Sequence, residues 1–392
     1  MPSEDCAGSS VSVHCHCAAV ANPGLVAPAV ENVNSSTFNF TTTQGSTNFT
    51  TLTNVTPFEE ENDYGGMSSV WQTFRSQGIP EAACKLIMDS WRLGTRKQYS
   101  TYLRRWINFC GQQQIDYLQP PLELALTFLT NLFTEGLSYS ALNTARSALS
   151  SLISFEDGTK FGSHPLVIRL LKGMYHNRPP KPRYSTIWNV DTVLSYLKGL
   201  APVSNLSLKE LSLKLTMLLL LVTGQRGQTI HLLNLDNMTI LDNQCIFTIS
   251  GLLKQSRQGK SNPLIVLKAF KQDVRICVFA TLLEYIARTN DLRHSERFLL
   301  ISYIKPHKRI SRDTLTRWVS VTMEKAGIDI SRFKPHSTRA ASTSKAKQNS
   351  VNLEGILSTA GWSSARTFAL FYDKPILEQS HFSDGVLNGN KD

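Results

Sequence analysis

Three short clusters in the second half of the chain carry residues that can bind an anion and move a proton. In TGQRGQT, two glycines flank Arg226 directly after a leucine-rich stretch, so its guanidinium would be rigidly held and could bind two phosphate oxygens at once. In KPHSTRAAS, Pro335 favours a helix start, and His336 and Arg339 lie three positions apart on one face of that helix. The helix would offer a proton-transfer group, a fixed cation and its own positive N-terminus to one anion.

The third cluster, GWSSARTFALFYDKP, contains a tyrosine near its end. Ser363 or Ser364 can cap a short helix that runs to about Tyr372, and the DKP sequence at 373–375 stops it. Two phenylalanines shortly before Tyr372 favour an ordinary core aromatic, and Tyr372 is one of 11 tyrosines. By itself none of the three clusters identifies a function, because such residues recur together by chance.

The pattern around these clusters predicts a mainly α-helical fold with a small antiparallel β-sheet, in two domains. Residues 67–177 show apolar and aromatic side chains at helical spacing and are expected to form a helical domain. Three prolines in four positions of NRPPKPRY cannot continue a helix, so 178–187 are expected to form a basic linker. Residues 188–385 are expected to form a mixed, mostly helical domain, followed by a tail at 386–392.

The hydrophobic periodicity places individual elements within these domains. Helices are expected at 95–110, 122–137, 191–200, 206–223, 273–288, 311–326 and 336–347. Strands are expected at 238–241, 245–250 and 263–267, with a polar turn between the first two.

The first 66 residues differ from the rest of the chain in composition and charge. They are rich in Ser, Thr and Asn without periodicity, and we expect a disordered acidic tail. This tail contains seven acidic residues and no Lys or Arg, so its charge of −7 leaves +18 for the remainder of a chain of net charge +11. A basic protein suits a phosphate backbone, although basicity alone is a weak indication. Five basic residues around one expected helix start could meet phosphates or form an ordinary solvated face: Arg92, Arg96, Lys97, Arg104 and Arg105.

The cysteines and apolar stretches exclude several classes of protein. Seven scattered cysteines show neither a disulfide framework nor a zinc spacing, so we expect a reducing compartment and no metal site. The longest purely apolar stretch near the middle, 217–222, is too short to cross a bilayer. No basic segment followed by an apolar run suggests a secretory route.

The order of the chemically able residues resembles that of the tyrosine recombinase family, over about residues 70–385. The ordered set is Arg226, a lysine on a hairpin, His336, Arg339, Trp362 and, ten residues later, Tyr372. The resemblance implies a helical core-binding domain at 67–177 and a catalytic domain at 188–385. In that family the lysine lies between the second and third strands of the sheet. Lys254 in GLLKQSRQGKSNPLIV occupies that place, and Lys260, nearer the next strand, is the alternative.

Two details refine the resemblance. The TGQR sequence, the LKQSRQGK hairpin and Trp362, where many members have His, resemble recombinases of eukaryotic mobile elements of the Crypton and DIRS kinds. Many relatives carry an acidic residue three positions after the first arginine, but here that position is Thr229. The sequence therefore leaves open which residue holds Arg226 in place.

The resemblance also implies a mechanism that needs neither metal, cofactor nor ATP. Tyr372 attacks a DNA phosphodiester, leaving a 3′-phosphotyrosyl link and a free 5′-hydroxyl. Arg226 and Arg339 neutralise the phosphate oxygens, and His336 assists proton removal or donates to a phosphate oxygen. Lys254 protonates the departing oxygen, while Trp362 can donate one hydrogen bond through its indole N–H.

The implied partner is double-stranded DNA, bound by a homo-oligomer that is a tetramer on paired sites, with no membrane involved. The mobile-element resemblance implies a location in the nucleus. Two other functions share the pattern. One is DNA relaxation by a type IB topoisomerase, and the other is DNA binding by a domesticated protein that no longer uses its chemistry.

Overall fold

The computed structural model describes residues 67–376 except positions 156, 257 and 260. The expected tails at 1–66 and 386–392, and Lys260, lie outside the described residues. The chain divides between Lys181 and Pro182 into two compact units, which we call unit 1 and unit 2. The division falls within 178–187, where we expected a linker.

Both ends of this connecting stretch are attached to the units beside them. The guanidinium of Arg178 donates to the backbone carbonyls of Phe133 and Leu137 at 2.8 and 2.7 Å, within unit 1. In unit 2, the backbone N–H of Ile187 donates to the carbonyl of Pro375 at 2.8 Å. The segment between Arg178 and Ile187, which can act as a linker, is therefore shorter than the expected 178–187.

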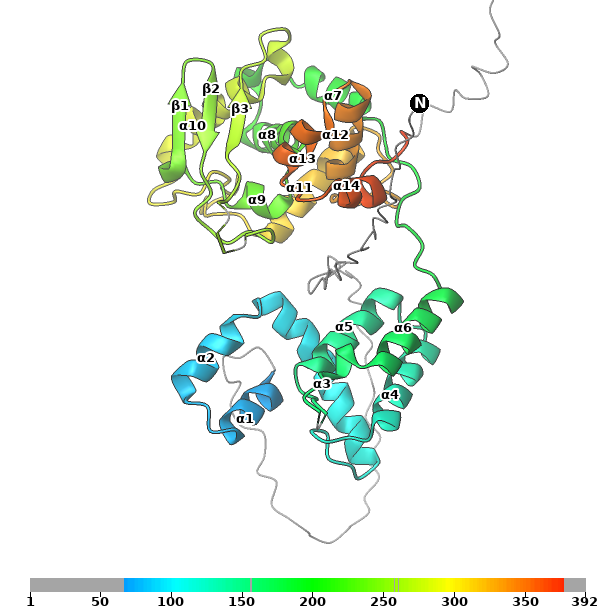
Figure 1. Cartoon of the computed structure of the whole chain (residues 1–392). Helices are drawn as coiled ribbons and strands as arrows, with labels where there is room; N and C mark the ends of the chain where they lie inside the picture. Colours follow the sequence, from blue (N-terminus) through cyan, green and yellow to red (C-terminus); the bar gives the residue numbers. More distant parts are fainter. Residues whose placement is uncertain (1–66, 156, 257, 260, 377–392) are drawn as a thin grey trace, which may run out of the picture. The chain divides into compact units, whose positions relative to one another are not determined.

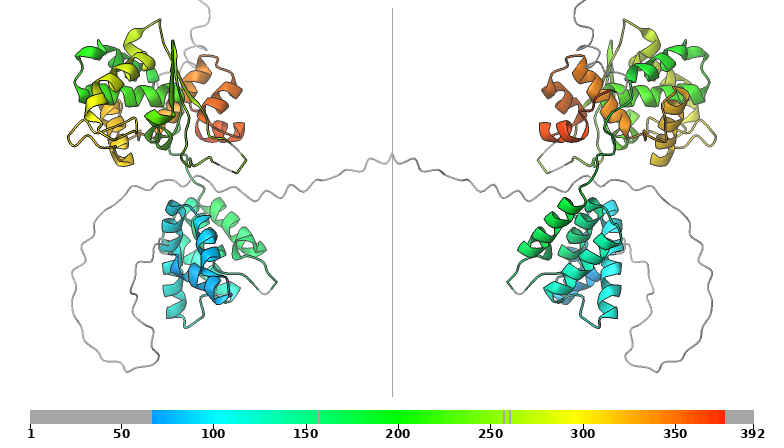
Figure 2. Two further views of the ribbon diagram at one scale, coloured as in Figure 1. Left: turned by 90° about the vertical axis from the view of Figure 1, so that its left-hand side faces the viewer. Right: turned by 90° about the vertical axis from the view of Figure 1, so that its right-hand side faces the viewer.

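In the described residues of unit 1, the regular elements are all helices (Figures 1 and 2). Its α-helices are α1 (Ser68–Ser76), α2 (Glu81–Asp89), α3 (Leu93–Gln112), α4 (Leu122–Thr134), α5 (Tyr139–Ser150) and α6 (Pro165–Asn177). Helix α3 packs along α5, and Trp106 is buried between helices while its indole N–H donates to the carbonyl of Tyr117 at 3.0 Å. Two of the five basic residues that could meet phosphates or form a solvated face make ion pairs within unit 1, Arg96 with Asp89 and Arg105 with Glu135.

Unit 2 is built around α8, whose sequence is so rich in leucine that it is buried on nearly all sides. Ser207 and Glu210 form a capping box at its start, and Gly224 ends it with a left-handed φ of 56°. Helices α10, α11 and α12 pack against it. The α-helices of this unit are α7 (Val190–Gly199), α8 (Leu208–Thr223), α9 (Gly227–His231), α10 (Val278–Thr289), α11 (Arg312–Lys325), α12 (Ser337–Gln348), α13 (Leu353–Ala360) and α14 (Ala365–Phe371).

A three-stranded antiparallel sheet of order β1-β2-β3 lies between α9 and α10 in the sequence. Its strands are β1 (Met238–Leu241), β2 (Gln244–Phe247) and β3 (Ile265–Lys268). The second strand ends earlier than the expected 250, because the side-chain amide of Asn262 donates to the carbonyls of Ile249 and Gly251 in place of a neighbouring strand. The expected helix at 273–288 is also shorter, since Cys277 caps α10 after a 3₁₀ turn at Val274–Ile276.

Figure 1 shows the strands on one side of α8 and helices α12–α14 together on the other, and the side views of Figure 2 keep α12–α14 as a separate group. The expected fold class, mainly helical with a small antiparallel sheet, is thus confirmed. No helix in the described part of the chain combines the length and apolarity needed to cross a membrane. Within that part, no three His, Cys, Asp or Glu side chains gather as metal ligands, and the four cysteines found there are free.

Candidate active site

Arg226 lies at the turn between α8 and α9, where the left-handed Gly224 redirects the chain. A side chain at Gly224 would press against Thr343 of α12, with a Cβ contact of 3.3 Å, so the turn is packed directly on that helix. Arg226 itself is half-buried and caps the start of α9. The turn therefore holds one guanidinium at a fixed place beside α12.

Thr229 stands at the position where many relatives carry an acidic residue, but its side chain does not hold the guanidinium of Arg226. Only its backbone N–H donates to the backbone carbonyl of Arg226, at 2.8 Å. Its hydroxyl donates to the side-chain oxygen of Gln225 at 3.3 Å, and Gln225 in turn donates to the carbonyl of Thr359 at 2.5 Å. Both side chains are buried. Thr229 and Gln225 thus fasten the turn to the end of α13.

Arg226 is held instead by a residue that the sequence patterns did not identify. Its Nη1 donates to Oε1 of Gln255 at 2.7 Å. Gln255 belongs to the loop between β2 and β3, and the signal that could have found it is its position directly after Lys254. Among the described residues, the side chain that holds Arg226 is therefore a neutral amide and not a carboxylate.

Lys254 lies in the same loop, at the surface. Its backbone N–H donates to Oε1 of Gln228 at 3.3 Å, and Nε2 of Gln228 donates to the carbonyl of Leu252 at 3.3 Å. Within the loop, Ser256 donates to Asn262 at 2.6 Å. These bonds attach the Lys254 segment to α9. Its charge lies close enough to His336 to lower the pKa of that histidine.

Helix α12 carries His336 at its N-terminal cap and Arg339 within its first turn. Arg339 is only 1% exposed, and its guanidinium stacks over the ring of Trp362 at 4.2 Å. Nη2 donates to the carbonyl of Ala360 at 2.7 Å, whereas Nε and Nη1 are buried without a hydrogen-bond partner among the described residues. Burial first, and the charge of Arg226 second, lower the pKa of Arg339 to about 9, so the group remains a cation at neutral pH.

Trp362 and Tyr372 complete the cluster from the last part of unit 2. Their rings lie 4.5 Å apart, and both residues are buried, at 7% and 8% exposure. The indole N–H of Trp362 also has no partner among the described residues. Ser364, one of the two expected caps, accepts from the N–H of Arg366 and starts α14, which ends so that Tyr372 follows it directly.

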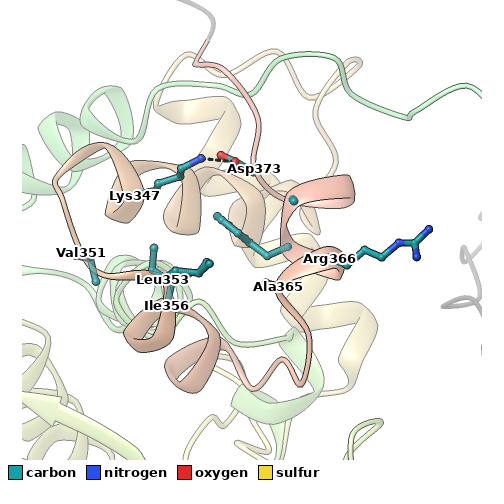
Figure 3. Close-up of a pocket in the computed structure, with 9 residues that line it drawn as sticks. Lys347, Val351, Leu353, Ile356, Ala365, Arg366 and Asp373 are labelled. Carbon is teal, nitrogen blue, oxygen red and sulfur yellow. Dashed lines mark hydrogen bonds and ion pairs between the residues drawn. The ribbon is translucent and has the colours of Figure 1, made fainter. Parts of the chain in front are cut away.

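Helix α12 also holds the backbone of Tyr372. The hydroxyl of Ser344 donates to the carbonyl of Tyr372 at 2.8 Å and accepts from the N–H of Lys374 at 3.1 Å. One turn further along α12, Lys347 pairs with Asp373, as Figure 3 shows. The helix that carries His336 and Arg339 thus also fixes the tyrosine segment, so the three side chains are placed by one element.

We expect Ser344→Ala to reduce the rate of any reaction of Tyr372 by about tenfold, because two buried backbone groups lose their partner and the segment loosens. The matched control is Ser342→Ala, which removes a bond from the same helix to the carbonyl of Leu221, away from the tyrosine. Covalent capture of DNA measured for both variants checks this. Equal rates in the two variants would show that Ser344 does not position Tyr372.

His336 completes the group, with its ring centroid 6.3 Å from that of Tyr372. The residue keeps an exposed surface, yet the protein packed around its ring disfavours the charged form. The positive charges of Arg339, Arg226, Lys254 and Arg183 act in the same direction, and together these effects lower the pKa of His336 to about 4. At neutral pH the imidazole is therefore uncharged and able to accept a proton.

This lowered pKa predicts a titration that can be measured by NMR. The ring signal of His336, assigned by its loss in His336→Gln, is expected to titrate at about pH 4, below the usual range of histidine. A bound duplex should shift the midpoint upward, because its phosphates offset the four cations. Since the folded-state pKa lies below the unfolded value, His336 also lowers stability as pH falls from about 6.5 towards 4. A midpoint near 6.5 in the free protein would contradict this account.

The structure thus brings together Arg226, Lys254, His336, Arg339, Trp362 and Tyr372 in unit 2. Neither Arg226 nor Arg339 pairs with a carboxylate among the described residues. A hollow of about 470 Å³ beside α14 is lined mainly by apolar side chains, including Val351 and Leu353 (Figure 3), and none of the six clustered residues lines it. The cluster can hold an anion between cations, next to a tyrosine and a neutral imidazole.

Residues 195–375, nearly all of unit 2, match the family model described as Phage integrase family. This part of unit 2 is therefore similar to the phage integrase family. No curated protein matches the chain.

One solved recombinase structure shares this fold, and two others have lower scores. The XerH site-specific recombinase, bound to palindromic difH substrate in a post-cleavage complex, has a TM-score of 0.51 and 14% identity over 77% of this chain and 79% of that chain. XerH in a pre-cleavage complex with difH has a TM-score of 0.49 and 14% identity over 83% and 85%. A lambda integrase dimer bound to a COC′ core site has a TM-score of 0.45 and 15% identity over 79% and 95%.

Proposed function

We propose that this protein is a site-specific DNA recombinase that cuts and rejoins DNA through a 3′-phosphotyrosyl intermediate. One observation carries the proposal. Arg339 is fully buried, its Nε and Nη1 have no partner among the described residues, and its guanidinium lies 5.3 Å from the ring of Tyr372. Leaving charged donors buried and unpaired is costly, so such groups need an explanation. An anion that arrives at the tyrosine supplies it.

The proposed mechanism is the one that the resemblance to tyrosine recombinases implies, and the clustering of the side chains supports it. The hydroxyl of Tyr372 attacks the scissile phosphorus, and the 5′-oxygen of the next nucleotide leaves. Arg226 and Arg339 neutralise the non-bridging oxygens of the five-coordinate phosphate, where a preorganised donor is typically worth about 3–4 kcal/mol. Neutral His336 takes part in moving the tyrosine proton, and Lys254 protonates the leaving 5′-oxygen. The free 5′-hydroxyl then reverses the reaction on the same or another strand.

The proposed partner is double-stranded DNA, bound by unit 2 and by a core-binding domain in unit 1. The structural similarity of XerH, in a complex named for its palindromic substrate, supports this choice. We also propose a homo-oligomer that becomes a tetramer on paired sites. The mobile-element character of the TGQR and LKQSRQGK sequences supports an origin in a Crypton or DIRS type element and a location in the nucleus.

Recombination and simple relaxation can be separated on one DNA. Sites would first be selected from a random duplex pool by binding to Tyr372→Phe protein, and two copies placed in a supercoiled plasmid. A recombinase exchanges the segments between the paired sites, whereas a type IB topoisomerase relaxes a plasmid with no site equally well. Relaxation without exchange would overturn the recombinase proposal. Binding with neither reaction would favour a domesticated DNA-binding protein.

A further inference from the structure

Six buried side-chain atoms in the described residues have no hydrogen-bond partner, and four of them lie at the active site. Three belong to Arg339 and Trp362, whose roles are proposed above. The fourth is Nε2 of Gln255. No role for this residue follows from the tyrosine, the two arginines, the lysine or the histidine, so its placement requires a separate explanation.

The orientation of the Gln255 amide is fixed by chemistry. A guanidinium has only donors, so the atom 2.7 Å from Nη1 of Arg226 must be the amide oxygen. The amide nitrogen then points elsewhere and obtains no acceptor. An unpaired buried N–H costs about 1–3 kcal/mol, which is as much as or more than one ordinary hydrogen bond returns. The orientation of the amide therefore adds little or nothing to the stability of the fold, but it keeps the hydrogen bond between the amide oxygen and Arg226.

Gly361 provides the space that this orientation requires. A Cβ at position 361 would lie 2.5 Å from Nε2 of Gln255, and the glycine has a left-handed φ of 71°. Gly361 immediately precedes Trp362. Three chain segments therefore meet at Gln255: the Arg226 turn, the β2–β3 loop with Lys254, and the turn between α13 and α14.

We propose that Gln255 is a positioning residue for DNA cleavage. Its uncharged amide oxygen holds the guanidinium of Arg226 and connects Arg226 to the loop that carries Lys254. This inference rests on the proposed function. A carboxylate in this place would neutralise part of the charge of Arg226. The amide fixes the guanidinium and leaves its full charge for the phosphate. Thr229 cannot do this, because its hydroxyl is bonded to Gln225.

The test compares Gln255→Met with Gln258→Met, a matched change at an exposed glutamine of the same loop. Single-turnover cleavage of a nicked duplex by Gln255→Met is expected to slow by up to about 10²-fold, as misplaced reacting groups typically do. Duplex affinity and melting temperature should stay at or near the wild-type values. Gln258→Met should behave as wild type. Wild-type cleavage must be seen first, because its absence would reject the proposed function and not this inference.

A second variant distinguishes positioning from a purely structural role. Gln255→Glu keeps an acceptor for Arg226, so it should recover much of the rate lost in Gln255→Met. Its negative charge should also raise the pKa of His336, against the effects of Arg339 on α12, Arg226 before α9, Lys254 in the β2–β3 loop and Arg183. The acid limb of the cleavage rate should then move to higher pH. Wild-type rates in Gln255→Met, or an unchanged pH profile in Gln255→Glu, would overturn the proposal.

Discussion

Arg339→Met is expected to slow DNA cleavage by about 10²–10³-fold while unit 2 stays at least as stable as in the wild type. The rate falls because two donors for the phosphate are lost. Stability is kept because methionine fills similar space without burying a charge whose Nε and Nη1 are unpaired. Single-turnover cleavage and thermal melting of the same preparations measure both effects.

Added sulfate offers an independent check on Arg339. It should raise the melting temperature of the wild type more than that of Arg339→Met, since an anion that binds the folded site stabilises it. Strong destabilisation of Arg339→Met would show that the buried guanidinium serves the fold. The unpaired Nε and Nη1 of Arg339 would then no longer support an anion site.

Tyr372→Phe is expected to abolish covalent capture of DNA and to keep duplex binding. The ring of Tyr372 packs on Trp362, and phenylalanine preserves that packing, so only the nucleophile is removed. Gel-shift affinity and denaturing-gel capture on a nicked duplex measure the two properties.

The matched control is Tyr303→Phe, which removes a hydroxyl elsewhere in unit 2 from a ring that stacks on Trp318. This variant should capture DNA as the wild type does. Full cleavage by Tyr372→Phe would reject the assignment of the nucleophile.

The parts of the fold that the sequence predicts well are those whose burial shows in local periodicity. The helix expected at 206–223 is α8 within two residues, and the one at 311–326 is α11 within one at each end. Where a tertiary contact sets the end of an element, the prediction fails. Asn262 ends β2 three residues early, and such a bond has no local signature.

The site follows the same division. The order of the residues from Arg226 to Tyr372 indicates the chemistry, because the ordered set is far more specific than any one of its members. Gln255 and Ser344 do not stand out, since neither belongs to that ordered set. Gln255 acts through Arg226, 29 positions earlier, and needs a glycine 106 positions later. The absence of an acid at Thr229 was visible in the sequence, but its neutral replacement was not.

The most direct test of the central claim is to identify the residue that becomes attached to DNA. A duplex selected by Tyr372→Phe protein, carrying a nick just beyond the cut site, would lose its short 5′-hydroxyl fragment and trap the intermediate. After nuclease and protease digestion, mass spectrometry should find a nucleotide 3′-phosphate on the peptide that contains Tyr372. Attachment to any other residue, or no covalent product from wild-type protein that binds the same duplex, would contradict the account.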